Sequence, residues 1–132
     1  MTVEYLGLES DLVGGHASGI VTEREVIDAF DNAVRKTNGN ALRKNVMTVF
    51  ANGTSLSLIG LDTLERIKKH IETWLRVYPG DDFKSAFVTS NPNDTRVLLL
   101  WKALTDAYPT VGRHVQVFQT ESDALTWLTA KT

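Results

Sequence analysis

The sequence predicts a single α/β domain in which about four helices cover a mixed sheet of four or five strands. Three observations lead to this prediction. The chain has 132 residues, close to the usual size of one domain. From residue 22 onward, segments with helical spacing of apolar side chains alternate with short apolar segments typical of buried strands. The first 21 residues contain two strand-like segments in succession, so an antiparallel hairpin is expected before a series of parallel β-α units.

The opening hairpin is predicted from residues 2–21. Apolar and polar side chains alternate in residues 2–9, and a turn is expected at residues 10–11. The returning segment contains three glycines: Gly14, Gly15 and Gly19. Because glycine weakens a strand and often marks irregular pairing, these residues predict a bulge in the second strand.

Spacing and end signals predict the remaining elements. Thr22 and Glu25 match a capping box, in which the threonine hydroxyl accepts a hydrogen bond from the amide three residues later. An apolar stripe opposite a charged face gives the clearest helical pattern, at residues 61–78. The predicted helices span residues 23–36, 61–78, 95–108 and a last segment after Thr120. The predicted strands between them are residues 46–51, 84–89 and 113–119.

Composition narrows the possible functions. With 16 acidic and 14 basic side chains the net charge is −2, which gives no general attraction to nucleic acid. The absence of cysteine excludes disulfides, thiol nucleophiles and cysteine metal sites, and no cofactor-binding motif is present. No apolar run approaches the roughly 18 residues of a membrane span. We therefore expect a cytoplasmic protein with no nucleic-acid partner, no membrane span and no cofactor.

Three segments carry a family resemblance. They are residues 19–22 with 25–27, residues 85–90, and residues 115–118 followed by Glu121 and the Ala-Leu-Thr-Trp-Leu sequence of 124–128. In this order they resemble the second strand and first helix, the later central strand, and the closing strand and helix of the anti-sigma-factor antagonist (STAS) fold. The chain looks most similar to the uncharacterised bacterial SpoIIAA-like branch, over nearly its whole length. The resemblance implies one STAS/SpoIIAA-like domain at residues 1–132.

STAS domains bind partner proteins such as anti-sigma factors, and many are switched by phosphorylation of a serine in an Asp-Ser-Ser-Gly turn at a helix start. The stretch that corresponds here is 57–61, with leucine and isoleucine at the two serine positions. The phosphorylation switch is therefore not carried over. The resemblance implies a non-enzymatic regulatory or interaction module whose partner is another protein or a second copy of the chain. The superfamily also shares its arrangement with lipid-carrying Sec14-type domains, which by itself does not establish lipid binding.

The alternative function is binding of a small anionic or lipid-like ligand. Thr54, Ser55 and Ser57 follow a predicted parallel strand and precede a helix, the place where α/β sheets collect ligands. His16 and Ser18 lie in the glycine-rich segment, whose amides could hold an anion. Capping, turn formation and a bulge explain the same residues equally simply. The ligand site is expected between these two segments and the 90–95 loop, and an apolar pocket between helix and sheet is the expected place for a lipid-like molecule.

A self-association surface is predicted on the helix at residues 95–108. Its expected core face consists of Val97, Leu100, Trp101, Leu104 and Tyr108, beside which Leu98 and Leu99 widen the apolar surface. These two leucines either contact a neighbouring segment or form a dimer interface. An enzyme ranks third, because no nucleophile–base pair is recognisable and the three histidines lack metal-ligand spacing. We therefore predict no catalytic residue and no metal.

Overall fold

The computed structural model describes residues 3–9, 12–78, 83–107 and 113–130. Along the chain the elements are β1 (Val3–Glu9), β2 (Leu12–Ala17), α1 (Glu23–Lys36), the 3₁₀ turn η1 (Asn40–Arg43), β3 (Asn45–Phe50), α2 (Leu61–Val77), β4 (Phe83–Val88), α3 (Pro92–Ala107), β5 (Arg113–Phe118) and α4 (Glu121–Thr129). The predicted α/β class, with four helices and a parallel sheet, is confirmed.

The strands lie side by side in their sequence order, from β1 to β5. Strands β2 to β5 are parallel, and β1 is paired antiparallel to β2. The turn predicted at residues 10–11 lies outside the described residues. The register of β1 shifts between Tyr5 and Gly7, which face Gly15 and Gly14, so the irregularity is in the first strand and not in the second as predicted.

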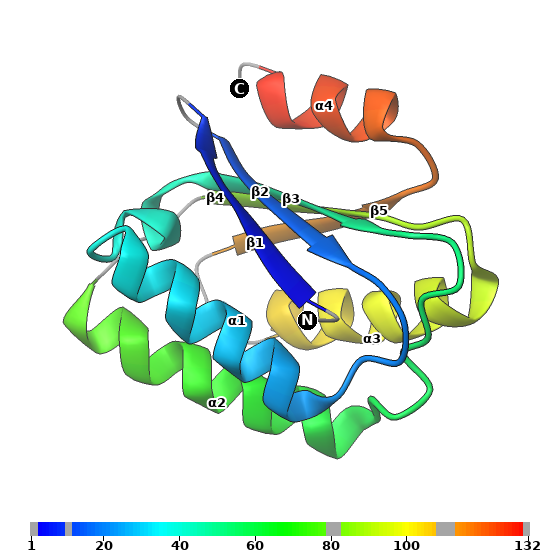
Figure 1. The fold of residues 1–132 in the computed structure, drawn as a ribbon, viewed down its shortest axis with the longest axis horizontal. Helices are drawn as coiled ribbons and strands as arrows, with labels where there is room; N and C mark the ends of the chain where they lie inside the picture. The colour runs from blue at the N-terminus through cyan, green and yellow to red at the C-terminus, as the bar shows by residue number, and fades with distance from the viewer. Residues whose placement is uncertain (1–2, 10–11, 79–82, 108–112, 131–132) are drawn as a thin grey trace.

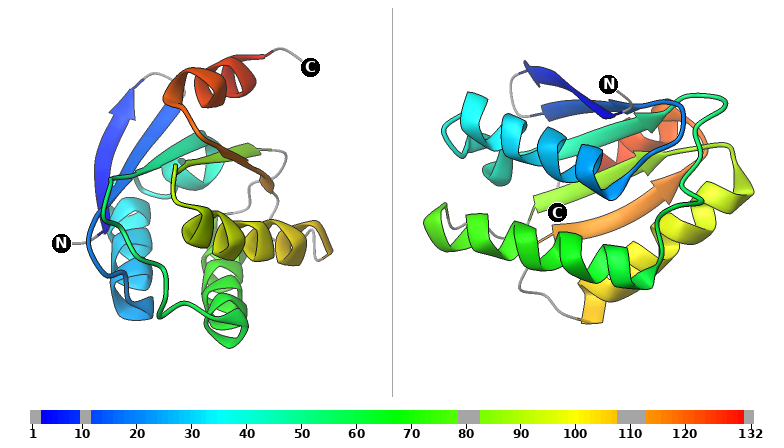
Figure 2. Two further views of the ribbon diagram at one scale, coloured as in Figure 1. Left: turned by 90° about the vertical axis from the view of Figure 1, so that its right-hand side faces the viewer. Right: turned by 60° about the horizontal axis from the view of Figure 1, so that its bottom comes forward.

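Helices α1, α2 and α3 all lie on one face of the sheet, and α4 covers part of the other face (Figures 1 and 2). This follows from the strand order. Each right-handed crossover from β2 to β5 moves to the next strand in the same direction, so each connecting helix falls on the same side. Because the order never reverses, the sheet has no switch point of the kind where doubly wound α/β proteins open a ligand crevice.

One apolar core forms on each face of the sheet. The larger lies between the sheet and α1–α3, and the buried members of its main cluster are Ala17, Val21, Leu56, Ile59, Leu64, Ile67, Leu98, Trp101 and Val115. Val13, Ala33 and Ala41 form a second cluster on the same face. The smaller lies under α4 and consists of Ala86, Val88, Ala124 and Leu128. Strand residues alternate between the two cores, since successive side chains of a strand point to opposite faces.

Helix α3 differs most from its prediction. It begins at Pro92, three residues earlier than expected, because Asn91 caps it: the Asn91 side chain accepts from the Asn93 amide at 2.9 Å. Its buried residues are Asp94, Leu98, Trp101 and Thr105. Leu100, placed on the core face by the sequence pattern, is 43% exposed, so the helix is rotated relative to the predicted face.

Candidate functional site

A cavity of about 260 Å³, partly open to solvent, lies between the sheet and helices α1, α2 and α3. All four neighbouring strands from β2 to β5 and all three helices contribute to its wall. The lining is almost entirely apolar and includes Val13, Phe30, Ile67, Ile71, Leu98 and Trp101. The cavity therefore occupies space inside the larger core.

Short side chains on facing elements leave this space open. Strand β2 contributes Gly15 and Ala17, and α1 contributes Ala29 and Ala33 opposite them. A Cβ atom at Gly15 would lie only 3.1 Å from the Thr48 hydroxyl oxygen. A side chain at this position would therefore occupy space in the cavity beside Thr48. The glycine that predicted a bulge thus has a different role in the structure.

Helix α2 adds to the space because it stands away from the sheet. Among the described residues, its nearest backbone neighbours are those of α1 and α3. Figure 2 shows α2 as the helix farthest from the strands. Its inward side chains Leu64, Ile67 and Ile71 line the cavity from that side.

An unfilled cavity of this size is energetically costly. Protein interiors are normally close-packed, and a residual cavity costs about 24 cal/mol per Å³. Because the 260 Å³ space is partly open to solvent, this coefficient sets an upper limit of about 6 kcal/mol on its cost. A molecule that fills the cavity and binds the native state would recover much of this free energy.

Polar contacts join α1 and α2 along the outside of the cavity. The Asp31 carboxylate oxygen Oδ1 lies 2.5 Å from His70 Nε2 and accepts a hydrogen bond from the Trp74 indole at 2.7 Å. Burial raises the pKa of Asp31, but these two hydrogen bonds and nearby positive charge outweigh it, so the pKa lies below its ordinary value.

A second pair lies one to two turns earlier on the same two helices. Arg66 binds Glu23 through Nε and Nη2, with the shortest distance 2.7 Å. The hydrogen bond from Arg66 lowers the pKa of the Glu23 carboxyl. Since Arg66 is well exposed, this pair contributes less than its geometry implies, whereas Asp31 is only 16% exposed.

The predicted residues Thr54, Ser55 and Ser57 do not line the cavity. Thr54 is buried, and its hydroxyl bonds the carbonyls of Ala51 at 2.5 Å and Ala17 at 3.1 Å, which joins the ends of β3 and β2. The Ser55 and Ser57 hydroxyls bond each other at 2.9 Å on the surface. All three make local structural contacts.

The two loops that the sequence placed together do meet. The backbone amide of Leu56 donates to Asp94 Oδ1 at 3.0 Å, which connects residues 52–60 to the first turn of α3. Asp94 is only 2% exposed, and its other oxygen has no hydrogen-bond partner within the described residues. The sequence analysis did not single out Asp94, although it lies one helical turn before Leu98 and hence on the same face.

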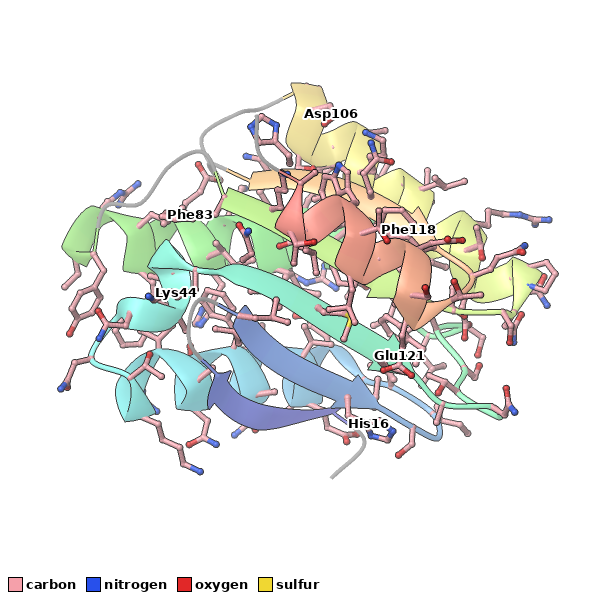
Figure 3. All side chains as sticks on the ribbon, turned by 90° about the horizontal axis from the view of Figure 1, so that it is seen from above. His16, Lys44, Phe83, Asp106, Phe118 and Glu121 are labelled. Atoms are coloured by element: carbon pink, nitrogen blue, oxygen red, sulfur yellow. The ribbon has the colours of Figure 1, made fainter. Side chains whose placement is uncertain are left out.

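His16 and the cavity lie on opposite faces of the sheet. Val13, Gly15 and Ala17 of β2 line the cavity, so His16 points to the side of α4, as Figure 3 shows. Ser18 directly follows β2 and does not line the cavity. The glycine-rich segment meets the 52–60 loop at Gly19, whose carbonyl accepts from the Ser55 amide at 2.8 Å, but neither His16 nor Ser18 lines the cavity.

Leu98 and Leu99 have different environments. Leu98 is 6% exposed and lines the cavity, so it is a core residue and is not available at the surface where the sequence analysis placed it. Leu99 is 49% exposed, next to Leu100. The rotation of α3 explains the difference, since its buried face runs through Leu98 and Trp101.

Within the described residues, no group of three histidine or carboxylate side chains is arranged to hold a metal ion. Among the helices of the described part, none is long and apolar enough to cross a membrane. Comparison of the chain with family models, with curated proteins and with solved structures finds no match.

Proposed function

We propose that this domain binds a small apolar molecule in the cavity between the sheet and helices α1–α3. The observation that carries the proposal is the 260 Å³ apolar space within the main core. Ligand pockets are typically concave, mostly apolar and largely preformed. Of the two leucines expected at a self-association surface, Leu98 belongs to the cavity wall and Leu99 is 49% exposed beside Leu100.

The volume limits the size of the ligand. An apolar cavity of about 150 Å³ in another protein holds benzene, with six carbon atoms. By proportion, a space of 260 Å³ holds roughly ten non-hydrogen atoms. A fused two-ring compound or a short branched chain has this size, whereas a full-length acyl chain would extend beyond the cavity.

The proposal is tested by filling the cavity from α1. Ala29 is buried and lines it, so Ala29→Leu places additional carbon atoms inside. Ala103, exposed on α3, provides the matched control Ala103→Leu. Naphthalene, with ten carbons, serves as the probe in a ¹H–¹⁵N NMR titration. We expect the wild type and Ala103→Leu to show saturable shifts at cavity residues, and Ala29→Leu to bind at least tenfold more weakly.

Saturable shifts of equal affinity in Ala29→Leu, or no shifts in the wild type up to the solubility limit of naphthalene, would contradict the proposal. The thermal midpoint of each variant is measured first, because a well-fitted Ala29→Leu should unfold at a temperature equal to or higher than the wild type. A variant that binds poorly while fully folded then reports loss of the cavity.

A second candidate function is supported by exposed apolar side chains beside the 52–60 loop. Ile20, Leu58 and Leu61 are 61%, 60% and 50% exposed, and Ile20 pairs with Ser55 of that loop. In the resemblance to STAS domains, residues 57–61 correspond to the regulatory turn. We propose that a protein partner or a second copy of the chain docks there, as a STAS/SpoIIAA-like module of the bacterial cytoplasm would do. The order of elements, with four helices after the second strand, supports this resemblance.

Light scattering tests the homodimer form of this second proposal. Leu58→Asp should reduce the mass of a dimer to that of the 14.7 kDa monomer, whereas Val77→Asp, exposed at the far end of α2, should leave the mass unchanged. A dimer that survives Leu58→Asp would exclude this surface as its interface.

A further inference from the structure

We infer that the ligand is a neutral compound with one hydroxyl or carbonyl group, and that the hydroxyls of Thr48 and Ser85 bind this group on the floor of the cavity. The inference rests on the proposed ligand-binding function and specifies the chemistry of that ligand. It depends on three features: the position of the two hydroxyls, their lack of protein partners, and the absence of charge in the lining.

Thr48 and Ser85 come from the two central strands. In the pairing of β3 with β4, Val46 lies beside Ser85 and Thr48 beside Phe87, so the two hydroxyl residues are diagonal neighbours on one face. Both line the cavity. Adjacent strands are about 4.8 Å apart and two residues span about 6.6 Å, which puts their α-carbons roughly 8 Å apart. Thr48 and Ser85 are therefore close enough to form one polar site on the sheet side of the cavity.

Gly15 leaves Thr48 open to the cavity. It is the direct neighbour of Thr48 on β2, and a Cβ atom built there would have the Thr48 Oγ1 as its nearest atom, at 3.1 Å. The hydroxyl thus points over a strand position without a side chain. A ligand group can occupy that position at hydrogen-bond distance.

Within the described part of the chain, no hydrogen bond of the Thr48 or Ser85 side chain is found, whereas the hydroxyls of Thr54 and Thr105 are bonded to carbonyls. Ser85 is buried and Thr48 is partly exposed. Among the described residues only Asp94 Oδ2 is a sealed side-chain oxygen without a partner, so both hydroxyl oxygens are accessible and a ligand acceptor or donor can bond them. A water molecule bound to both hydroxyls would have two polar partners, the lower end of the usual range, whereas a ligand also fills the apolar space around them.

The lining also excludes charge. Among the described residues, no lysine, arginine, histidine, aspartate or glutamate lines the cavity. An ionised carboxylate or amine would enter without a counter-charge, which is strongly unfavourable at an apolar site. The anionic ligand considered from the sequence is therefore not the one that this cavity accommodates.

Three matched probes test the inference: naphthalene, 2-naphthol and 2-naphthoate, measured by NMR titration at pH 7. One added hydrogen bond should make 2-naphthol bind about three- to tenfold more tightly than naphthalene. The naphthoate anion should bind at least tenfold more weakly than 2-naphthol. Thr48→Val, which keeps the side-chain shape, combined with Ser85→Ala, should abolish the preference for 2-naphthol and leave the affinity for naphthalene within about twofold.

Thr126→Val on the exposed face of α4 is the control and should preserve the preference. If naphthalene binds but 2-naphthol binds no more tightly, or if the preference survives in Thr48→Val/Ser85→Ala, the hydroxyl anchor is wrong while the cavity function stands. Equal or tighter binding of naphthoate overturns the neutral-ligand assignment. Failure of all three probes to bind removes both the inference and the function on which it rests.

Discussion

Asp94 shows how one buried side chain positions the wall of the cavity. Its Oδ1 accepts from the amide of Leu56, and Leu56 itself lines the cavity. Asp94→Ala would leave that buried amide without a partner, which costs about 1–3 kcal/mol in the free energy of unfolding. Asp94→Asn keeps an oxygen in the same place and loses only the interaction of the charge with the start of α3, less than about 1 kcal/mol. Urea unfolding of both variants measures the difference.

Equal destabilisation by Asp94→Ala and Asp94→Asn would show that the charge of Asp94, and not its hydrogen bond to Leu56, stabilises the fold.

For single residues, the sequence predicted a helix cap correctly but did not indicate the role of Asp94. The Thr22 cap was predicted, and its hydroxyl accepts from the Glu25 amide at 3.2 Å. Asp94 acts on a residue 38 positions away, so no local pattern could indicate its role.

Asp31 connects helices α1 and α2 through its contacts with His70 and Trp74. Because the pKa of Asp31 is lowered in the folded protein, its stabilising effect is present above the unfolded value of about 4. The effect is lost as the pH falls through the lower, folded pKa. We expect wild type to exceed Asp31→Asn by about 1 kcal/mol in the free energy of unfolding at pH 7, and this difference to shrink towards pH 3.

Urea unfolding at several pH values between 3 and 7 measures that difference. Asp106→Asn, which alters an exposed pair with Lys102 on α3, is the control and should show no comparable trend. A difference between wild type and Asp31→Asn that stays constant over this range would mean that the charge of Asp31 does not contribute to the contact between α1 and α2.

Elements with a strong local signal were predicted well, and the others depended on distant contacts. Helix α2 was expected at residues 61–78 and ends at Val77, because its apolar stripe and charged face are continuous in sequence. Strand β2 ends at Ala17, four residues before its predicted end, since Gly19 and Ile20 turn away to pair with the Ser55 segment. That pairing joins residues 35 positions apart and leaves no periodic signal.

For the whole molecule, the cavity is the property that the sequence could indicate only in outline. A pocket between helix and sheet was among the expectations, but its place depends on small residues from separate elements, such as Gly15 and Ala29, that face each other only after folding. It also depends on the distance of α2 from the sheet, which the packing of α2 on α1 and α3 sets. Neither quantity is a local property of the chain.

A hollow core also predicts how the protein responds to pressure. Unfolding eliminates internal voids, so pressure favours the unfolded state, with volume changes of about −20 to −100 mL/mol that scale with the void volume. With 260 Å³ of space between the sheet and α1–α3, part of it closed to solvent, we expect the cavity to contribute to this volume change. Ala29→Leu, or saturation with naphthalene, should reduce its magnitude by on the order of tens of mL/mol, whereas Ala103→Leu should not. Tryptophan fluorescence under pressure measures the volume change of unfolding, because Trp101 lines the cavity. Identical volume changes in the wild type, Ala29→Leu and the naphthalene complex would mean that the cavity is already filled by the protein itself in solution.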